Sequence, residues 1–226
     1  MLECPILVGG GGESGIYTTT KSIVSVDRGV SITASVYAQT GDIILATIMY
    51  RDINDMVTPD GWTLLFNSNA TAIDSSLNHR FGFFKKKITF DGEVSVTFNQ
   101  TASARIMLNL ITIKNANDVV YRSEYTQYFS SETVNRFVGI PNKENNDTKL
   151  IWGLTSSLWS NPNSPPYGLW LTSPFDVEIF QISDYQSPPR LCNIIDLGNG
   201  SVNKSVKPSP LLTQLISFGV AAVEII

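Results

Sequence analysis

The pattern of apolar and polar residues along this chain is that of β-strands almost throughout. The clearest segment is 43–50, a short apolar run rich in β-branched residues that follows the turn-forming pair Gly41-Asp42. A run of this length and composition favours a strand buried on both faces over a helix. A Pro-Asp-Gly turn at 59–61 comes next and leads into Trp62, whose large side chain we expect in the core.

Alternation predicts the other strands of the first half. We expect Asp27-Arg28-Gly29 to form a turn between the first two of them. The predicted strands are 22–26, 30–38, 62–66, 79–88, 94–98 and 103–113.

The second half repeats this order at an offset of roughly 110 residues. Segment 146–154 resembles the strand after Gly41, and Phe175 stands roughly where Trp62 does. The other matching segments are 172–180 with 59–66, 190–195 with 80–88, 200–202 with 92–94, and 212–226 with 104–116. The pattern predicts an all-β fold: an antiparallel β-sandwich of jelly-roll type, built from two related strand sets that share one core.

The first residues differ from the rest. We interpret 1–16 as a flexible N-terminal docking arm and 17–226 as a single β-sandwich domain. In the arm, Pro5, Ile6, Leu7 and Val8 can add an extended strand to a partner, and glycines at 9–12 supply a hinge.

Three of the glycines, Gly10, Gly12 and Gly15, formally match the G-x-G-x-x-G fingerprint of dinucleotide sites. Threonines at 18–20 follow them, and threonine is a poor helix former. Without a helix N-terminus to hold a pyrophosphate, the sequence predicts no such site.

The composition points to a surface that is polar without being highly charged. Only 16% of the 226 residues are charged, the formal net charge is −4, and hydrophobic residues make up 42%. Such a surface suits packing against neighbours. The basic cluster Lys85-Lys86-Lys87 lies in a predicted strand, where alternation splits it between two faces, so we interpret it as an edge strand kept soluble by lysines rather than a nucleic-acid footprint.

The two cysteines, Cys4 and Cys192, are far apart and lack metal-ligand spacing, so we expect free or buried thiols. The first residues have no basic n-region, and no segment reaches transmembrane length. We therefore expect a protein that is soluble when made in the cytoplasm, without membrane insertion.

Motifs for catalysis or cofactors are not found. The one histidine, His79, has no nucleophile motif to pair with. Segment 52–55 is similar to a calcium loop, but Met56 stands where the third ligand belongs. Most carboxylates fall at predicted turns, where Asp is a turn former. We predict no enzyme activity, no metal and no cofactor, and keep a hydrolase as the third alternative.

An aromatic segment at 158–170 is the best candidate for recognition. Trp159, Tyr167 and Trp170 are interleaved there with asparagines and prolines. Rigid rings beside amides suit sugar or protein binding. The alternative is that these side chains plug the ends of the sandwich.

Over residues 20–226 the chain resembles a β-sandwich domain that recurs in tailed-bacteriophage structural proteins and in some bacterial surface proteins. The likeness lies in the Gly-Asp run at 41–50, Pro-x-Gly-Trp-Thr at 59–63, Phe-Phe-Lys at 83–85, the Ser-Ala-led run at 103–113, and the reprise ending in strand 219–226. The second copy lacks the Gly-Trp pair.

The resemblance implies a non-enzymatic virion structural protein, either a capsid decoration protein or a tail or fibre component. It would dock on a symmetric assembly of other virion proteins and copies of itself. The alternative is a receptor- or carbohydrate-binding module that uses segment 158–170 to bind a host glycan.

Overall fold

The computed structural model describes residues 15–50, 56–67, 80–129, 138–139, 147–158, 169–171, 178–182, 190–198, 205–208 and 216–226. Every regular element in these ranges is a β-strand. Within the same ranges, no helix has the length and hydropathy needed to cross a membrane.

The strands form three antiparallel sheets. Sheet A has the order β1-β5-β2-β4-β3, sheet B the order β10-β11-β8-β13-β6, and sheet C the order β7-β12-β9. Their bounds are β1 (Tyr17–Ala38), β2 (Ile43–Tyr50), β3 (Thr63–Asn67), β4 (Arg80–Lys87), β5 (Gly92–Lys114), β6 (Val119–Phe129), β7 (Val138–Gly139), β8 (Lys149–Leu158), β9 (Leu169–Leu171), β10 (Glu178–Ile182), β11 (Arg190–Asp196), β12 (Ser205–Pro208) and β13 (Ile216–Ile225). The predicted all-β antiparallel fold is confirmed.

Strand β2 is the central strand of sheet A, and the predicted burial of both its faces is confirmed. All of its residues are buried, because β5 and β4 flank it and both faces of the sheet are covered. The turn before it is closed by the Asp42 amide donating to Gln39 O, with Gly41 at φ 96°. The Pro59–Trp62 turn has the same form, with Gly61 at φ 74°, a conformation that glycine adopts without strain.

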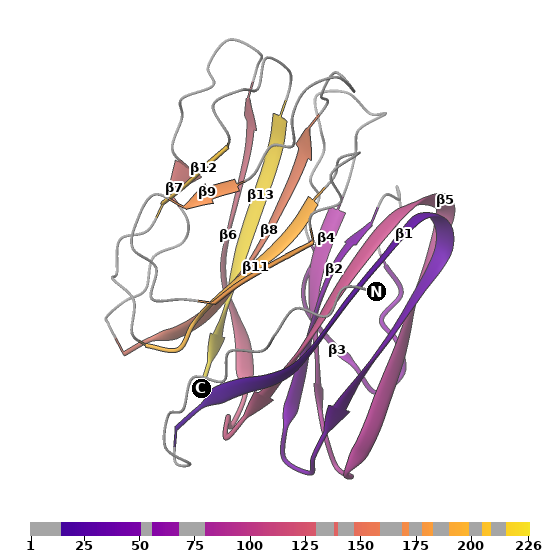
Figure 1. The fold of residues 1–226 in the computed structure, drawn as a ribbon, viewed down its shortest axis with the longest axis vertical. Coiled ribbons are helices and arrows are strands. Elements are labelled where there is room, and N and C mark those ends of the chain that lie inside the picture. Colours follow the sequence, from indigo (N-terminus) through magenta and orange to yellow (C-terminus); the bar gives the residue numbers. More distant parts are fainter. Residues whose placement is uncertain are drawn as a thin grey trace.

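Strands β1 and β5 are long and bent, as Figure 1 shows. They pair from Tyr17↔Lys114 to Ala38↔Gly92, with irregularities between Val26 and Ser31. The chain does fold back at Asp27–Gly29, since Gln39 just after β1 lies beside Lys114, the partner of Tyr17, but it does so as a bend within one continuous strand rather than as a turn between two strands. Gln100 fills the bend, and its Nε2 donates to Gly29 O at 2.7 Å and to Ala104 O at 3.0 Å.

Beyond the bend, residues 31–38 of β1 and 92–99 of β5 form a two-stranded ribbon that lies over one face of sheet A. We call this pair the first ribbon. The core beneath it includes Trp62, which is 8% exposed and meets the Phe98 ring edge-on at 6.1 Å between centroids. The expectation that Trp62 anchors the core is confirmed.

The other face of sheet A packs on sheet B, which makes a β-sandwich. This second core joins residues of β2, β4 and β5 to residues of β8, β11 and β13, among them Leu45, Phe83 and Ile111 from sheet A and Ile151 and Val223 from sheet B. Figure 1 shows the two sheets side by side, sheet B drawn in colours from rose (β6) to yellow (β13).

The two sheets repeat one strand order. Reading sheet B from its β6 edge gives β6-β13-β8-β11-β10, and each strand takes the place of β1, β5, β2, β4 or β3 in turn. Two related strand sets are thus confirmed. The predicted jelly-roll connectivity is not confirmed. Each of these sheets takes its strands from one half of the chain, whereas a jelly roll is formed from two interleaved Greek keys.

One further detail differs from expectation. Strand β4 is not an edge strand, since it lies between β2 and β3. Its lysines point to two sides, as alternation predicts: Lys85 donates to Asp118 Oδ1 and Val119 O, while the Nζ of Lys86 approaches Gly61.

Candidate functional site

The predicted recognition residues lie mostly outside the described ranges. Trp159 and Tyr167 are in this group, as are Pro5, Ile6, Leu7 and Val8 of the arm. The backbone of Trp170 belongs to β9, where it pairs with Lys207 of β12. Leu158 ends β8, so strands form both ends of the segment that we predicted to be a loop.

The described chain begins at Gly15, near the end of the predicted arm 1–16. Gly15 O accepts a hydrogen bond from Asn115 Nδ2 at 3.0 Å, and Tyr17 pairs with Lys114. Asn115 has φ 59°, a left-handed conformation that asparagine tolerates better than most residues. Residues 15–17, which we call the arm root because the predicted arm ends there, are therefore fixed to the end of β5.

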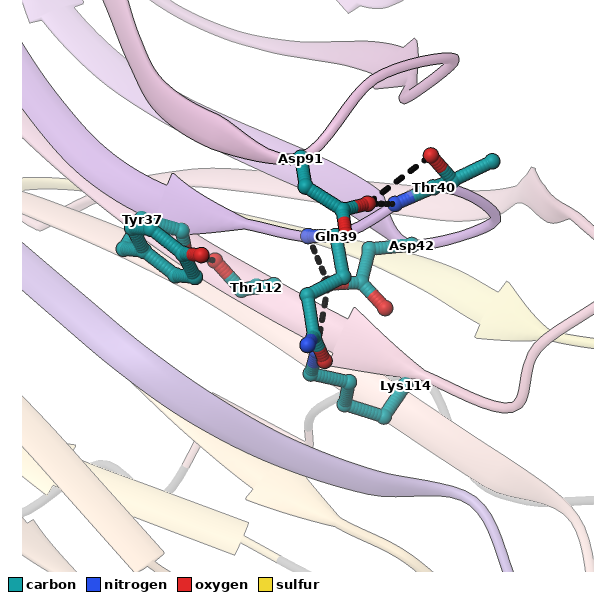
Figure 2. A network of polar contacts seen from close by, with 7 residues as sticks. All are labelled: Tyr37, Gln39, Thr40, Asp42, Asp91, Thr112 and Lys114. Atoms are coloured by element: carbon teal, nitrogen blue, oxygen red, sulfur yellow. Dashed lines mark hydrogen bonds and ion pairs between the residues drawn. The ribbon is translucent and has the colours of Figure 1, made fainter.

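A polar network connects this root to the start of the first ribbon (Figure 2). Lys114 Nζ lies 2.6 Å from Asp42 Oδ2 and donates to Gln39 Oε1 at 2.8 Å. Asp42 also accepts from the Gln39 amide at 2.7 Å, and it is 5% exposed. The Thr40 amide and hydroxyl both donate to Asp91 Oδ1, at 2.7 and 2.9 Å.

The network binds the turn before β2 to both ends of β5, since residues 39–42 contact Lys114 and Asp91. The two Thr40 hydrogen bonds, first the backbone one, hold the pKa of Asp91 below its ordinary value of 3.8. Asp91 immediately precedes the Gly92 end of β5, whereas Lys114 is its other end. Both ends of β5 thus meet at the arm root.

A second polar group lies in the middle of the sandwich and is fully buried. Asn193 Nδ2 donates to Thr47 Oγ1 at 2.9 Å and to Trp152 O at 3.2 Å, and Asn193 Oδ1 accepts from Asn109 Nδ2 at 2.7 Å. Asn109 Oδ1 has no hydrogen-bond partner. Buried side chains in this network fix the placement of one sheet on the other.

A third group joins the two halves at the β5–β6 connection. Lys85 binds Asp118, and Lys87 Nζ donates to Asn117 O at 3.2 Å. The Lys85 hydrogen bond, followed by that of the Val119 amide, lowers the pKa of Asp118 below its ordinary 3.8. Ile226 closes the group by pairing with Asp118 through backbone hydrogen bonds at 3.1 and 2.9 Å.

These groups differ in what they offer chemically. The buried amides have no exposed surface to present to a ligand, and the two surface groups consist of carboxylates already bound by lysine or threonine. Among the described residues, no cluster of three or more His, Cys, Asp or Glu side chains has the arrangement to hold a metal. Cys192 lies in β11, while Cys4 and His79 fall outside the described ranges.

Sequence reasoning did not find the residues of these groups. Asn109 interrupts an otherwise apolar run, which is a signal that a polar partner is buried with it. Its partner Asn193 is distant along the chain, and no periodicity connects the two. Lys114 gave no signal apart from its place at a strand end.

Comparison with protein-family models, with curated proteins and with solved structures gave no match.

Proposed function

We propose that the protein is a non-enzymatic structural component of a bacteriophage virion, as a capsid decoration protein or as part of the tail or its fibre. It docks on a symmetric assembly through its N-terminal arm, and its partners are other virion proteins and copies of itself. The place of action is the virion.

The observation that carries this proposal is the exposed face of the first ribbon. Its outward side chains bear hydroxyl, amide or phenol groups, and Glu93 is the only charged one. The outward residues are Ser31, Thr33, Ser35 and Tyr37 on β1 and Glu93, Ser95, Thr97 and Asn99 on β5. The centres of protein interfaces are depleted of charge in the same way.

Side chains on the exposed face of the first ribbon also contact each other across the two strands. Thr33 and Thr97 lie opposite each other, and their Oγ1 atoms are 2.8 Å apart. A regular face of mostly uncharged polar side chains is suited to pack against a neighbouring subunit in a repeating array. The sequence resemblance to phage structural domains supports the same role.

Removal of the arm tests the docking role. Deletion of residues 1–12 is expected to leave a folded protein, judged by an unchanged circular dichroism spectrum, that no longer joins particles assembled without the wild-type chain. A truncated protein that joins particles as well as the full chain does would overturn arm docking.

Glycan binding by the isolated protein tests the alternative, a receptor- or carbohydrate-binding module. A glycan array with the isolated protein is expected to show no specific binding. Specific binding that is lost in Trp159→Ala and Tyr167→Ala, at an unchanged melting temperature, would replace the structural role by recognition through segment 158–170.

A further inference from the structure

Sheets A and B meet at a layer of six residues, three from each sheet, which we call the middle layer. Its members are Asn109, Thr47 and Phe83 of sheet A and Ala221, Gly153 and Asn193 of sheet B. Within each trio the residues are register partners on adjacent strands, in the order β5-β2-β4 and β13-β8-β11. All six residues are buried.

Each residue of the middle layer has a counterpart in the other sheet, because each strand of sheet B takes the place of a strand of sheet A. The counterparts are Thr47 and Gly153, Asn109 and Ala221, and Phe83 and Asn193. In each of these pairs the two residues differ in size or polarity. The middle layer is therefore the place where the repeated architecture of the two sheets is broken in chemistry.

On one side of the middle layer the sheets fit by shape. A Cβ atom on Gly153 would lie 2.6 Å from Phe83 Cζ and 3.1 Å from Thr47 Cγ2, so the ring fills the space that glycine leaves. The threonine that sheet A carries at the counterpart position would not fit there without movement of Phe83 and Thr47.

On the other side the sheets fit by hydrogen bonding. Asn193 Oδ1 accepts from Asn109 Nδ2 at 2.7 Å, and Asn193 Nδ2 donates to Thr47 Oγ1 at 2.9 Å. Sheet A carries Phe83 at the counterpart position of Asn193, and a phenyl ring offers neither of these hydrogen bonds.

Two copies of sheet A paired in the same arrangement would lose both fits. Phe83 of each copy would lie opposite Asn109 of the other, and the two Thr47 side chains would meet in the centre. Each Asn109 amide would then be buried without its partner, which costs free energy. Two copies of sheet B would pair Asn193 with Ala221 and leave empty space between their glycines, which is also unfavourable.

A chain with two related halves needs such a distinction. Exchange of halves between copies is a common way for repeated domains to misassemble. Selection between partners is a difference of affinities, and groups left clashing or unpaired in the wrong complex supply it.

We propose that the middle layer selects the partner of each sheet, so that sheet A forms a sandwich with sheet B and not with sheet A of a second copy of this chain. Sheet B likewise does not pair with its own kind. This inference goes beyond the virion role and does not rest on it, because the contacts that carry it lie within one chain.

A substitution in the full chain reproduces the contacts of a wrong pairing. Asn193→Phe places a ring opposite Asn109 and Thr47, as the pairing of two A sheets would. It is expected to lower the equilibrium constant for folding by about tenfold or more, because the core is overpacked and the Asn109 amide loses its acceptor.

Two further substitutions should correct this mismatch. Thr47→Gly and Asn109→Ala give the new ring the small neighbours that Phe83 has in sheet B. The triple variant is expected to have an equilibrium constant for folding about tenfold or more above that of Asn193→Phe, measured by urea unfolding.

The matched control carries Thr47→Gly and Asn109→Ala without the ring. These two changes are expected to destabilise the otherwise wild-type chain, because they empty the core and remove both partners of Asn193. The same pair of substitutions thus has opposite effects in the two backgrounds. A triple variant that fails to fold, or that is no more stable than Asn193→Phe, would overturn the proposal.

Disulfide trapping reads partner choice directly. In a pairing of two A sheets the central strands β2 lie opposite each other, so residue 45 of one copy faces residue 45 of the other. Leu45→Cys is made in a Cys4→Ser and Cys192→Ser background, and the chain is refolded at high concentration under oxidising conditions. Electrophoresis without reductant then separates single chains from chains joined through residue 45.

With the wild-type middle layer we expect single chains. In the triple variant both sheets carry the same layer of phenylalanine, glycine and alanine, so chains joined through residue 45 are expected to appear. Joined chains with the wild-type layer, or none in the triple variant, would overturn partner selection by these residues. Particle assembly is a separate measurement, so failure here and failure of the virion role are distinguishable.

Discussion

Asn193 of β11 donates to Thr47 of β2 across the two sheets, at 2.9 Å between Nδ2 and Oγ1. Beside them Gly153 of β8 lies against the same Thr47. Counted from the first residues of their strands, Thr47 and Gly153 hold the same position in β2 and β8. Equivalent residues of the two halves therefore face each other, which is the arrangement that an approximate twofold axis produces.

Gly153→Ala is expected to destabilise the fold by about 1–3 kcal/mol, the usual cost of overpacking a core. A Cβ at this position would lie 2.6 Å from Phe83 Cζ and 3.1 Å from Thr47 Cγ2, and both neighbours are fully buried. Urea unfolding measures the change. Gly15→Ala is the matched control, because nothing lies within 4 Å of its added Cβ; equal stability of the two variants would contradict the close contact of the sheets.

Asn193→Leu alone is expected to cost about 2–3 kcal/mol, because it leaves the buried Asn109 Nδ2 without its acceptor. Adding Asn109→Leu removes the stranded partner as well. The double variant is then expected to lose less free energy of unfolding than the two single variants together. Strict additivity in this cycle would show that the hydrogen bond between the sheets carries no coupling.

Trp62→Ala is expected to cost about 3–5 kcal/mol, the range for removing a large buried aromatic residue. The ring supports the ribbon through Phe98, so the loss should also speed hydrogen exchange in 92–99. Leu64→Ala, two residues later and 42% exposed, is the control and should change stability little. A Trp62→Ala protein as stable as this control would place the tryptophan outside the core.

Acid should weaken the junction of the halves through Asp118. The folded state lowers the pKa of this carboxyl, so its contribution to stability is present at neutral pH and is lost as the pH falls below the ordinary 3.8 and through the lowered value. The melting temperature of Asp118→Asn should therefore lie below wild type at pH 7 and approach it in acid. In a Lys85→Met background the pH-dependent part of the difference should shrink, and a gap that stays constant with pH would exclude the Lys85 contact as its cause.

Local patterns predicted the first sheet well because its signals are short-range. The segment 43–50 is uniformly apolar between two turns, and Gly41 and Gly61 stand where the backbone takes positive φ. Asp27–Gly29 predicted a turn between two strands because turn residues also occur where one strand bends. Only the pairing of β1 with β5 on both sides of these residues distinguishes a bend from a turn.

Long-range features could not be predicted in this way. Strand β6 had no counterpart in the predicted pattern, although it completes sheet B as β1 completes sheet A. The pairing of Asn109 with Asn193 depends on how the sheets face each other, which periodicity does not encode. The repeat in the sequence did predict the shared strand order, because each half carries its own register and turn signals.

Mass spectrometry of purified particles tests the virion role most directly. Under the proposed function the chain is encoded by a phage, whose particles are to be purified by density gradient and the chain quantified against the major capsid protein. We expect the full chain in every preparation, at a fixed ratio that matches a symmetric copy number of the capsid or tail. A chain that is abundant in infected cells and missing from purified particles would contradict the proposed function.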